Sequence, residues 1–504
     1  MSEIVEGDSR PKSQPSEITD ARPIAAPSQS VNHRIFRALL SLASANLLIR
    51  VMGMLNQVVV TARFGQGSTM DAYYVAQALP VLLAQMFSSA LESSVIPVYT
   101  QIHDRGRTCP YPTPNNNDQA SRLFSTLLNL LIIGFILCIT TMFLFRRQLI
   151  FFSAPALKAH TLVLATNLTP LIFPMLLFMT LNSFMECLLN AEGQFGWPAY
   201  IGTLVPITTA TFVLLGGKSI GITMLCIGTL VGQVLQLVMV MIRAHAINIR
   251  YRFVLDLRSK EIAVIAGLAW PVLFGALISQ ASPIVDQIFA SQLSDGSIAA
   301  INNALKLISV PVGVIFASAG RAMLPYLANQ VATKNMPAFK ATFRLYLWLV
   351  SISTAIMTAA MILLARPIVQ ILFQHGAFSV ADAHRTANTL IGFSIGLTPM
   401  AIGFIAARAF SALGKTRVLM YVTIFSIFAN ALFDYIFGRL WQSFGIAFAT
   451  SIVYSCTMII LLALLRGTIG KLGLFTLPQE ILATIWKPGP ASYYARWITW
   501  KKGV

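Results

Sequence analysis

The sequence predicts an all-α polytopic membrane protein with about 12 transmembrane helices, arranged as two six-helix lobes around a central cavity. Hydrophobic residues make up 56% of the 504 residues and charged residues only 11%, whereas a soluble globular protein carries roughly 25% charged residues. Apolar stretches of about 20 residues recur along most of the chain, and each is long enough to cross a bilayer as a helix. Spanning β-strands would instead alternate between apolar and polar residues in short segments.

The net charge of +18 does not point to nucleic acid, because most basic residues lie in short loops between apolar segments. A positive-inside bias explains this distribution better, so no nucleic-acid partner is expected. The five cysteines form no CxxC pair and lie mostly within apolar segments, which favours packing over metal or disulfide roles.

The elements follow from the order of polar and apolar stretches. Residues 1–35 are polar and rich in Pro and Ser, so we expect a disordered cytoplasmic tail, and no signal peptide precedes the first span. Apolar runs then predict helices near 38–62, 71–99, 121–145, 161–190, 197–216, 220–243, 263–290, 297–328, 342–365, 386–412, 418–438 and 444–466. We assign 36–250 to the N-lobe (helices 1–6) and 251–466 to the C-lobe (helices 7–12). Residues 467–504 form a basic and aromatic cytoplasmic tail that suits a membrane surface.

The positions of Lys and Arg predict the orientation. With the N-terminus inside, basic residues on the cytoplasmic side outnumber those in the outer loops by about three to one. The loop at 243–260 alone contributes Arg243, Arg250, Arg252, Arg258 and Lys260. Both termini are therefore expected in the cytoplasm.

The two halves of the chain resemble each other faintly. Gly67 and Pro97 enclose an apolar stretch in the first half, and Gly296 and Pro325 enclose one of nearly equal length in the second. Repeated six-helix halves are typical of alternating-access transporters, which hold their substrate between the halves.

Several predicted helices carry polar side chains at membrane depth, where a charge costs roughly 2.5–3.5 kcal/mol on insertion scales. The polar positions are Asn46, Arg50, Gln57 and Thr61 in the first helix, Gln85, Ser88, Ser89 and Glu92 in the second, Asp286 in the seventh, and Lys306 and Arg321 in the eighth. For the Ser, Thr and Gln residues we favour polar packing between helices. For Arg50, Asp286 and Lys306 we favour a water-filled cavity, because intramembrane charges usually mark a pathway.

The sequence gives little support for catalysis, since it has no nucleophile elbow, P-loop, HExxH or paired-cysteine motif. We therefore expect a transporter and not an enzyme.

The sequence resembles the MurJ (MviN) lipid II flippases of the multidrug/oligosaccharidyl-lipid/polysaccharide (MOP) exporter superfamily, and its expected fold is MOP/MATE-like. The segments that carry the resemblance are residues 50–53, 64–65, 71–76, 95–98, 189–195, 311–313, 324–325, 372–378 and 408–417. They extend over about residues 36–466, and their order and spacing together are specific.

The resemblance implies a flippase that moves an undecaprenyl-diphosphate-linked saccharide across the bacterial inner membrane by alternating access, through a cationic cavity. The substrate is then lipid II for peptidoglycan synthesis and cell wall biogenesis. Two family arginines fall on Arg50 and Lys306, and a family aspartate falls on Asp71. We expect the protein to work as a monomer.

The chain departs from the family pattern at several of these positions. An arginine and an aspartate of the first helix are here Asn56 and Gln57, and an arginine of the second is Ala84. We interpret Glu92 and Arg321 as charges that replace, at new positions, those lost from the family pattern. Gln85 of the second helix is also expected to line the cavity and bind substrate. The family's last two helices, which form a groove for the lipid tail, are expected to be absent.

The resemblance also implies a sodium ion in the C-lobe as the coupling ion. The matching ligands are Asp286, Asn430, Asp434, the carbonyl of Ile446, and Thr450. Residues four apart lie on one helix face, so Asn430 joins Asp434 and Ile446 joins Thr450. Five oxygen ligands suit a hard cation. A proton shared by the two aspartates is the alternative.

Three other functions remain open from the sequence. An exopolysaccharide or O-antigen repeat-unit flippase would suit the altered cavity and the missing groove. A multidrug/cation antiporter of the same fold would need an acidic, aromatic cavity, which Arg50 and Lys306 disfavour. A non-transporting assembly factor is the third.

Overall fold

The computed structural model describes residues 29–108, 115–194, 196–246, 251, 253–256 and 259–470. Every regular element within these residues is an α-helix. The predicted tails lie mostly outside them. However, α1 already begins at Gln29, so residues 29–35 are helical and not part of a disordered tail. No proline interrupts the chain between Pro27 and Phe64, so the first spanning helix continues beyond its apolar part.

Sixteen helices make up the described chain. In order they are α1 (Gln29–Phe64), α2 (Ser68–Thr108), α3 (Asn115–Leu144), α4 (Arg146–Ser153), α5 (Ala159–Ala191), α6 (Gly196–Ile201), α7 (Leu204–Gly216), α8 (Thr223–Ala246), α9 (Lys260–Ser279), α10 (Ala281–Ala290), α11 (Ser297–Ala332), α12 (Met336–Leu363), α13 (Ala365–Phe373), α14 (Val380–Ile395), α15 (Leu397–Ala412) and α16 (Thr416–Ile469).

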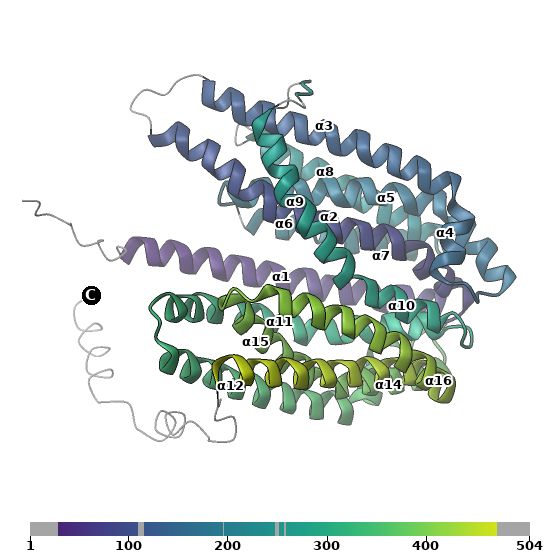
Figure 1. Cartoon of the computed structure of the whole chain (residues 1–504). Coiled ribbons are helices and arrows are strands. Elements are labelled where there is room, and N and C mark those ends of the chain that lie inside the picture. The colour runs from purple at the N-terminus through teal and green to yellow at the C-terminus, as the bar shows by residue number, and fades with distance from the viewer. Residues whose placement is uncertain are drawn as a thin grey trace, which may run out of the picture.

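The predicted spans correspond to these helices, but three of them are broken. The fifth span is divided into α6 and α7, the seventh into α9 and α10 at Gln280, and the tenth into α14 and α15 at Gly396. The last two spans form the single element α16, whose backbone is non-helical at Trp441 and Gln442. There the chain turns back on itself (Figure 1). Broken helices free backbone groups inside the protein and are common at transport sites.

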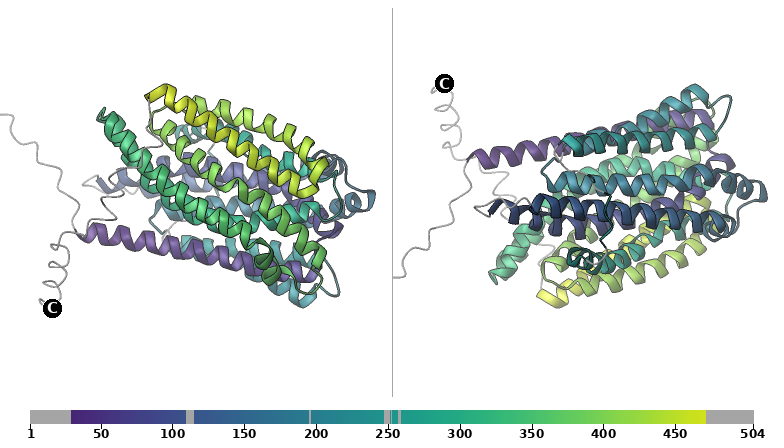
Figure 2. Two further views of the ribbon diagram at one scale, coloured as in Figure 1. Left: turned by 90° about the horizontal axis from the view of Figure 1, so that it is seen from below. Right: turned by 90° about the horizontal axis from the view of Figure 1, so that it is seen from above.

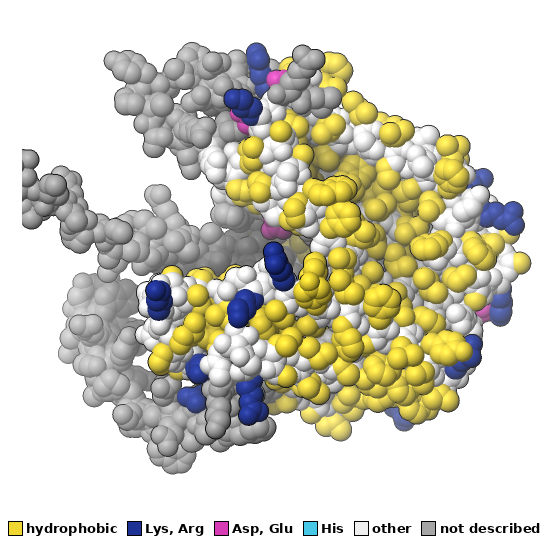
Figure 3. Space-filling view, in the orientation of Figure 1, with side chains coloured by type: hydrophobic (Ala, Val, Ile, Leu, Met, Phe, Trp, Pro, Cys, Tyr) yellow, Lys and Arg dark blue, Asp and Glu magenta, His cyan; other side chains and the backbone are white. Residues whose placement is uncertain are grey.

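Nine helical stretches of the described chain are long and apolar enough to cross a membrane. Leu204–Gly216 and Ser297–Gly313 are shorter apolar helices, and the stretch Thr416–Ile469 contains two spans. Together they account for the twelve predicted spans. On the face seen in Figure 3, hydrophobic side chains cover the middle, and most Lys and Arg lie towards the two ends. This protein is therefore a multi-span membrane protein.

The helices form two bundles, with α2, α5, α7 and α8 in one and α11, α12, α14, α15 and α16 in the other (Figure 1). Helix α1 packs on α6 and α7, and it also contacts α11 along the seam between the bundles. The start of α1 and the end of α16 lie at the same end of the molecule, called here the terminal end (Figures 1 and 2). The opposite end is called the far end.

The two lobes share a hydrophobic core only towards the far end. One cluster of buried residues combines Met70 and Phe173 of the N-lobe with Ile298, Phe373 and Phe393 of the C-lobe. Towards the terminal end the core divides. One separate cluster belongs mainly to α2, α3, α5 and α8, and another to α11, α12, α15 and α16. The lobes are thus joined at the far end and separate at the terminal end.

Helix α9 does not follow the lobe boundary expected at residue 250. It packs chiefly against α2 of the N-lobe, whereas α10, directly after the break at Gln280, packs against α16 of the C-lobe. The segment before α9 is tied to α3, because Tyr251 Oη donates to Asn129 Oδ1 at 2.8 Å and Asn129 Nδ2 donates to the Val254 carbonyl at 3.0 Å. The seventh span therefore connects the two lobes.

Candidate functional site

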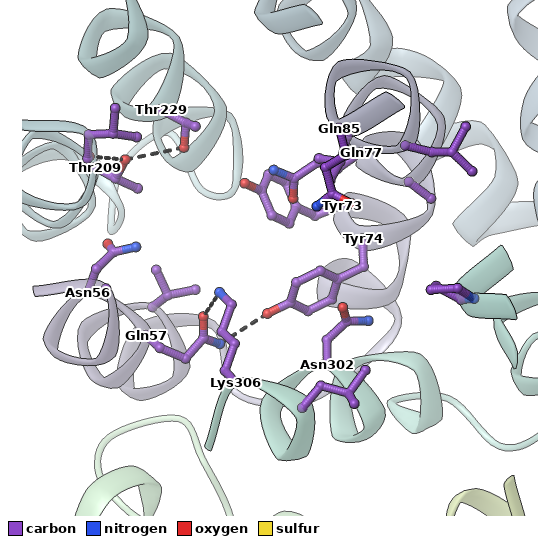
Figure 4. A pocket seen from close by; sticks show the side chains of 18 of the residues that line it. Asn56, Gln57, Tyr73, Tyr74, Gln77, Gln85, Thr209, Thr229, Asn302 and Lys306 are labelled. Carbon is purple, nitrogen blue, oxygen red and sulfur yellow. Dashed lines mark hydrogen bonds between the residues drawn. The ribbon is translucent and has the colours of Figure 1, made fainter. Parts of the chain in front are cut away.

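A cavity of about 710 Å³ lies between the two lobes. Helices α1, α2, α5, α7 and α8 supply one wall, and α10 and α11 supply the other. Figure 4 shows polar side chains around this space, with Gln57 of α1, Tyr74 of α2 and Lys306 of α11 close together. In the described part of the chain, the charged residues of the lining are Lys306, Asp286 and Glu186.

Lys306 is the cation of this lining. Its Nζ donates to Gln57 Oε1, and Gln57 Nε2 donates to Asn303 Oδ1 at 2.6 Å and to Tyr74 Oη at 3.0 Å. The Nζ atom also lies 5.8 Å from the centroid of the Tyr74 ring. The neutral Gln57 oxygen and the Tyr74 ring thus hold the ammonium in place. Because Lys carries three N–H donors, it can still donate to an anion in the cavity.

Arg50 lies beside the cavity and not in its lining. Its Nη1 donates to the Ser309 carbonyl at 2.6 Å, and its guanidinium packs against Gly313, where a Cβ would collide with it. Ser309 is three residues after Lys306 on α11, so the two cations follow one another along the seam of α1 and α11.

Asn56 and Gln85 lie in the lining with Gln57. The Asn56 Oδ1 atom is buried and has no hydrogen-bond partner among the described residues. Gln85 accepts a hydrogen bond from Gln280 Nε2 at 2.6 Å. Gln85 therefore connects α2 with the break between α9 and α10.

Besides Arg50, the predicted binding residues Asp71 and Glu92 lie outside the cavity lining. Asp71 is buried in the contact between the lobes, where its carboxylate accepts hydrogen bonds from the backbone N–H groups of Gly296 at 2.6 Å and Ala299 at 2.8 Å. Glu92 is exposed on α2 and outside the lining. Arg321 belongs to α11, but its side chain is outside the described ones. Asp71 thus caps the N-terminus of α11, which is favourable for an anion.

Further contacts close the far end around Asp71. Hydrogen bonds between the two lobes join Ala377 N to Ala62 O at 2.7 Å, Thr386 Oγ1 to Gln66 Oε1 at 2.5 Å and Gln287 Nε2 to Ser153 O at 3.3 Å. An ion pair between the lobes joins Lys158 to Asp295 at 2.6 Å. With the core divided at the terminal end, this arrangement is that of a transporter closed at the far end.

The charge of the lining differs from the cationic cavity that the family resemblance implies. Its described residues include one cation and two carboxylates. Arg50 is held at the seam by Ser309, and the positions of two family arginines are here Asn56 and Ala84. The positive charge is therefore confined to the α1 and α11 side.

Three of the five residues predicted to bind sodium come together in the C-lobe. Asn430 Nδ2 donates to Asp286 Oδ1 at 2.5 Å and to Asp434 Oδ2 at 2.7 Å. The other two lie one turn apart on α16, where Thr450 Oγ1 donates to the Ile446 carbonyl at 3.1 Å. All five residues are buried, and Asp286 also belongs to the cavity lining.

This cluster has the chemistry of a cation site. Among the described residues, the buried Asp434 Oδ1 atom has no hydrogen-bond partner. Two carboxylates buried side by side are costly unless a cation or a proton balances them. The carboxylates of Asp286 and Asp434 supply oxygen donors, which hard cations prefer, whereas the Asn430 amide turns its Nδ2 towards both of them. The carboxylate pair therefore fits a sodium ion.

Glu186 is a cavity residue that the sequence interpretation missed. It belongs to α5 and accepts a hydrogen bond from Gln236 Nε2 of α8 at 2.9 Å. It is the only charged residue in the predicted span 161–190. The rule that singled out Lys306, that a charge at membrane depth marks a pathway, would have found it as well.

Known proteins resemble this chain in both sequence and fold. The family model described as "Lipid II flippase MurJ" matches residues 60–499. A protein of Buchnera aphidicola subsp. Acyrthosiphon pisum, described as a probable lipid II flippase MurJ, is 26% identical over 428 residues, which cover 83% of this chain and 81% of that protein.

Two solved structures have a similar fold. One is a lipid II flippase MurJ in an inward closed conformation, with a TM-score of 0.71, 23% identity, and coverage of 84% of this chain and 87% of that one. The other is a multidrug resistance MATE family transporter of the MOP superfamily in an inward-facing conformation, with a TM-score of 0.70, 14% identity, and coverage of 87% and 99%. Both therefore support the two-lobed transporter fold.

Proposed function

Because this chain belongs to the lipid II flippase MurJ family, we propose that it translocates lipid II across the bacterial inner membrane by alternating access. Lipid II is a polyprenyl-diphosphate-linked glycan, so the protein must hold a diphosphate and a large polar headgroup between its lobes. The substrate is hydrophilic at one end and apolar at the other, which suits a cavity between lobes that face lipid on their outside.

The observation that carries this proposal is the ammonium of Lys306 in the cavity lining. A diphosphate that enters the cavity can accept N–H groups from Lys306, with charge-assisted hydrogen bonds that are about twice as strong as neutral ones. Gln57, Asn303 and Tyr74 fix its position. Arg50, farther along the seam, offers a planar fork that suits a second phosphate once it leaves the Ser309 carbonyl.

Alternating access follows from the way the lobes are joined. The far end is closed by the capping of α11 by Asp71 and by the contacts around it. Opening the far end requires those contacts to break and the lobes to meet at the terminal end instead. With the orientation expected from the Lys and Arg distribution, both termini are cytoplasmic and the structure accepts its substrate from the cytoplasm.

We also propose that a sodium ion at Asp286, Asn430, Asp434, Ile446 and Thr450 couples to this cycle. Asp286 supports the coupling, because it belongs both to the buried cluster and to the cavity lining. A bound cation would neutralise the carboxylate pair. The side chains of α10 and α16 would then hold the ion between them, which fixes the position of the C-lobe wall of the cavity.

Complementation tests the substrate. A strain depleted of its own lipid II flippase should grow when this chain is expressed, and it should not grow with the Lys306→Ala variant present at the same membrane level. Failure of the unmodified chain to restore growth, together with rescue of an exopolysaccharide or O-antigen flippase mutant, would assign it a different lipid-linked saccharide.

A further inference from the structure

The N-lobe wall of the cavity carries a carboxylate that has no role in the diphosphate site. Glu186 lines the cavity from α5, half-buried, and accepts one hydrogen bond, from Gln236. No described Lys or Arg forms an ion pair with it. A carboxylate has about four lone-pair sites, so most of its hydrogen-bonding capacity remains open.

The neighbours of Glu186 are amide side chains and another carboxylate, so none of them neutralises its charge. Asn182, one turn before it on α5, donates to Gln233 Oε1 at 2.9 Å and to the Gln233 carbonyl at 3.1 Å. Gln233 and Gln236 both line the cavity from α8. Glu92 of α2 interacts electrostatically with Glu186 and adds negative potential. This wall therefore combines negative charge with amide groups.

Lys306 belongs to the other wall of the same cavity, supplied by the C-lobe. The cavity thus has an ammonium on the α11 side and a carboxylate on the α5 side, while the third charged residue of the described lining, Asp286 on α10, accepts a hydrogen bond from Asn430. A purely anionic ligand would be attracted by the first and repelled by the second. A ligand that carries an anionic and a cationic group, separated along its length, would match both.

We infer that Glu186 binds an ammonium group of the transported headgroup, with Gln236 and Gln233 as neutral neighbours. This inference rests on the proposed function and assigns one part of the substrate to one wall. Lipid II has a peptide arm with a free amino group, so its diphosphate would lie at Lys306 and its peptide ammonium at Glu186. A saccharide-only lipid lacks that ammonium and would leave Glu186 unpaired, which is unfavourable for a partly buried charge.

The test compares two substrates that differ by one charge. Purified protein in nanodiscs is titrated with lysine-type lipid II and with the same lipid II acetylated on the lysine amine. The unmodified protein should bind the free amine about tenfold more tightly, the value of one charge-assisted hydrogen bond in a partly solvated site. In Glu186→Gln, which keeps the size of the side chain and a hydrogen bond to Gln236, the two Kd values should become equal.

Glu261→Gln is the matched control, because it removes the same charge from an exposed position in the first turn of α9, outside the cavity. This variant should keep the tenfold preference. Equal binding of both lipids by the unmodified protein overturns the inference without any variant. If Glu186→Gln still binds the free-amine lipid more tightly than the acetylated one, the inference is also overturned. It is overturned as well if the only change in Glu186→Gln is that transport no longer depends on pH, because Glu186 would then carry a coupling proton. If lipid II in either form fails to bind or move, the proposed function itself is wrong.

Discussion

Substitution of Asp71 by Asn should weaken the closure of the far end. The Asp71 carboxylate accepts two backbone N–H groups, of Gly296 at 2.6 Å and Ala299 at 2.8 Å, and it is 4% exposed. These bonds join α2 of the N-lobe to the N-terminus of α11 in the C-lobe. They exist only while the far end is closed, so their loss should shift the equilibrium between conformations more than it lowers the stability of either lobe.

The size of the effect follows from the bonds lost. Asn keeps one side-chain oxygen as an acceptor but loses the charge that favours a helix N-terminus. We estimate a cost of about 1–2 kcal/mol to the closed state, since hydrogen bonds to charged groups contribute roughly 1.5–3 kcal/mol and part of the interaction remains. At 1.4 kcal/mol per factor of ten, the ratio of closed to open molecules should fall by about 5- to 30-fold.

Distances between spin labels can measure this ratio. Cysteines at Phe152 of α4 and Val380 of α14, which are 68% and 66% exposed near the far end, place one label on each lobe. The short-distance population should fall in Asp71→Asn. Asp295→Asn is the matched control, because it removes the Lys158 ion pair across the same gap, where both side chains are exposed and such a pair contributes less than about 1 kcal/mol. If Asp71→Asn shifts the distances no more than Asp295→Asn does, the cap on α11 does not hold the far end closed.

Three further predictions concern the binding sites and the orientation. Lys306→Ala should abolish transport and Arg50→Ala should impair it at equal expression, because each removes a phosphate donor; normal transport in both variants would disprove the diphosphate assignment. Sodium should raise the Tm of the unmodified protein at fixed ionic strength, and Asp286→Ala or Asp434→Ala should remove that rise. If the Tm of the unmodified protein does not change with sodium concentration, the ion site is contradicted. A reporter that is active only in the cytoplasm should work when fused at the C-terminus and fail when inserted near Asp295, whereas the opposite pattern would reverse the orientation.

Much of the fold could be predicted from the sequence, because the bilayer demands long apolar helices and leaves few alternatives. The twelve spans have helical counterparts at nearly the expected residues. The breaks at Gln280 and Gly396 were not predicted, although Gly396 is a helix-terminating residue and a proline follows each break by three residues, at Pro283 and Pro399. Hydropathy reports neither these signals nor the packing of one helix against another. The position of α9 on the N-lobe was missed for the same reason.

The candidate site was predictable where charge alone identifies a residue. Lys306 and Asp286 line the cavity, and each was singled out as a charge at membrane depth. Arg50 was singled out by the same rule but lies beside the lining, because periodicity gives the face of a helix and not the neighbour that holds a long side chain. Asp71 was expected to bind substrate, yet its partners are backbone N–H groups at the start of α11, the first of them on Gly296, 225 residues further along the chain. No local pattern reveals such a contact.

The central claim is tested most directly by transport in a defined membrane. Proteoliposomes that contain the purified chain and fluorescently labelled lipid II are mixed with a quencher that cannot cross the bilayer, and the protected fraction is followed with time. The unmodified chain should move lipid II from the protected leaflet, and Lys306→Ala at equal reconstitution should leave the protected fraction as it is in empty liposomes. If the unmodified chain does not lower the protected fraction, or if Lys306→Ala lowers it equally, the account of this cavity as a diphosphate-binding lipid II pathway is contradicted.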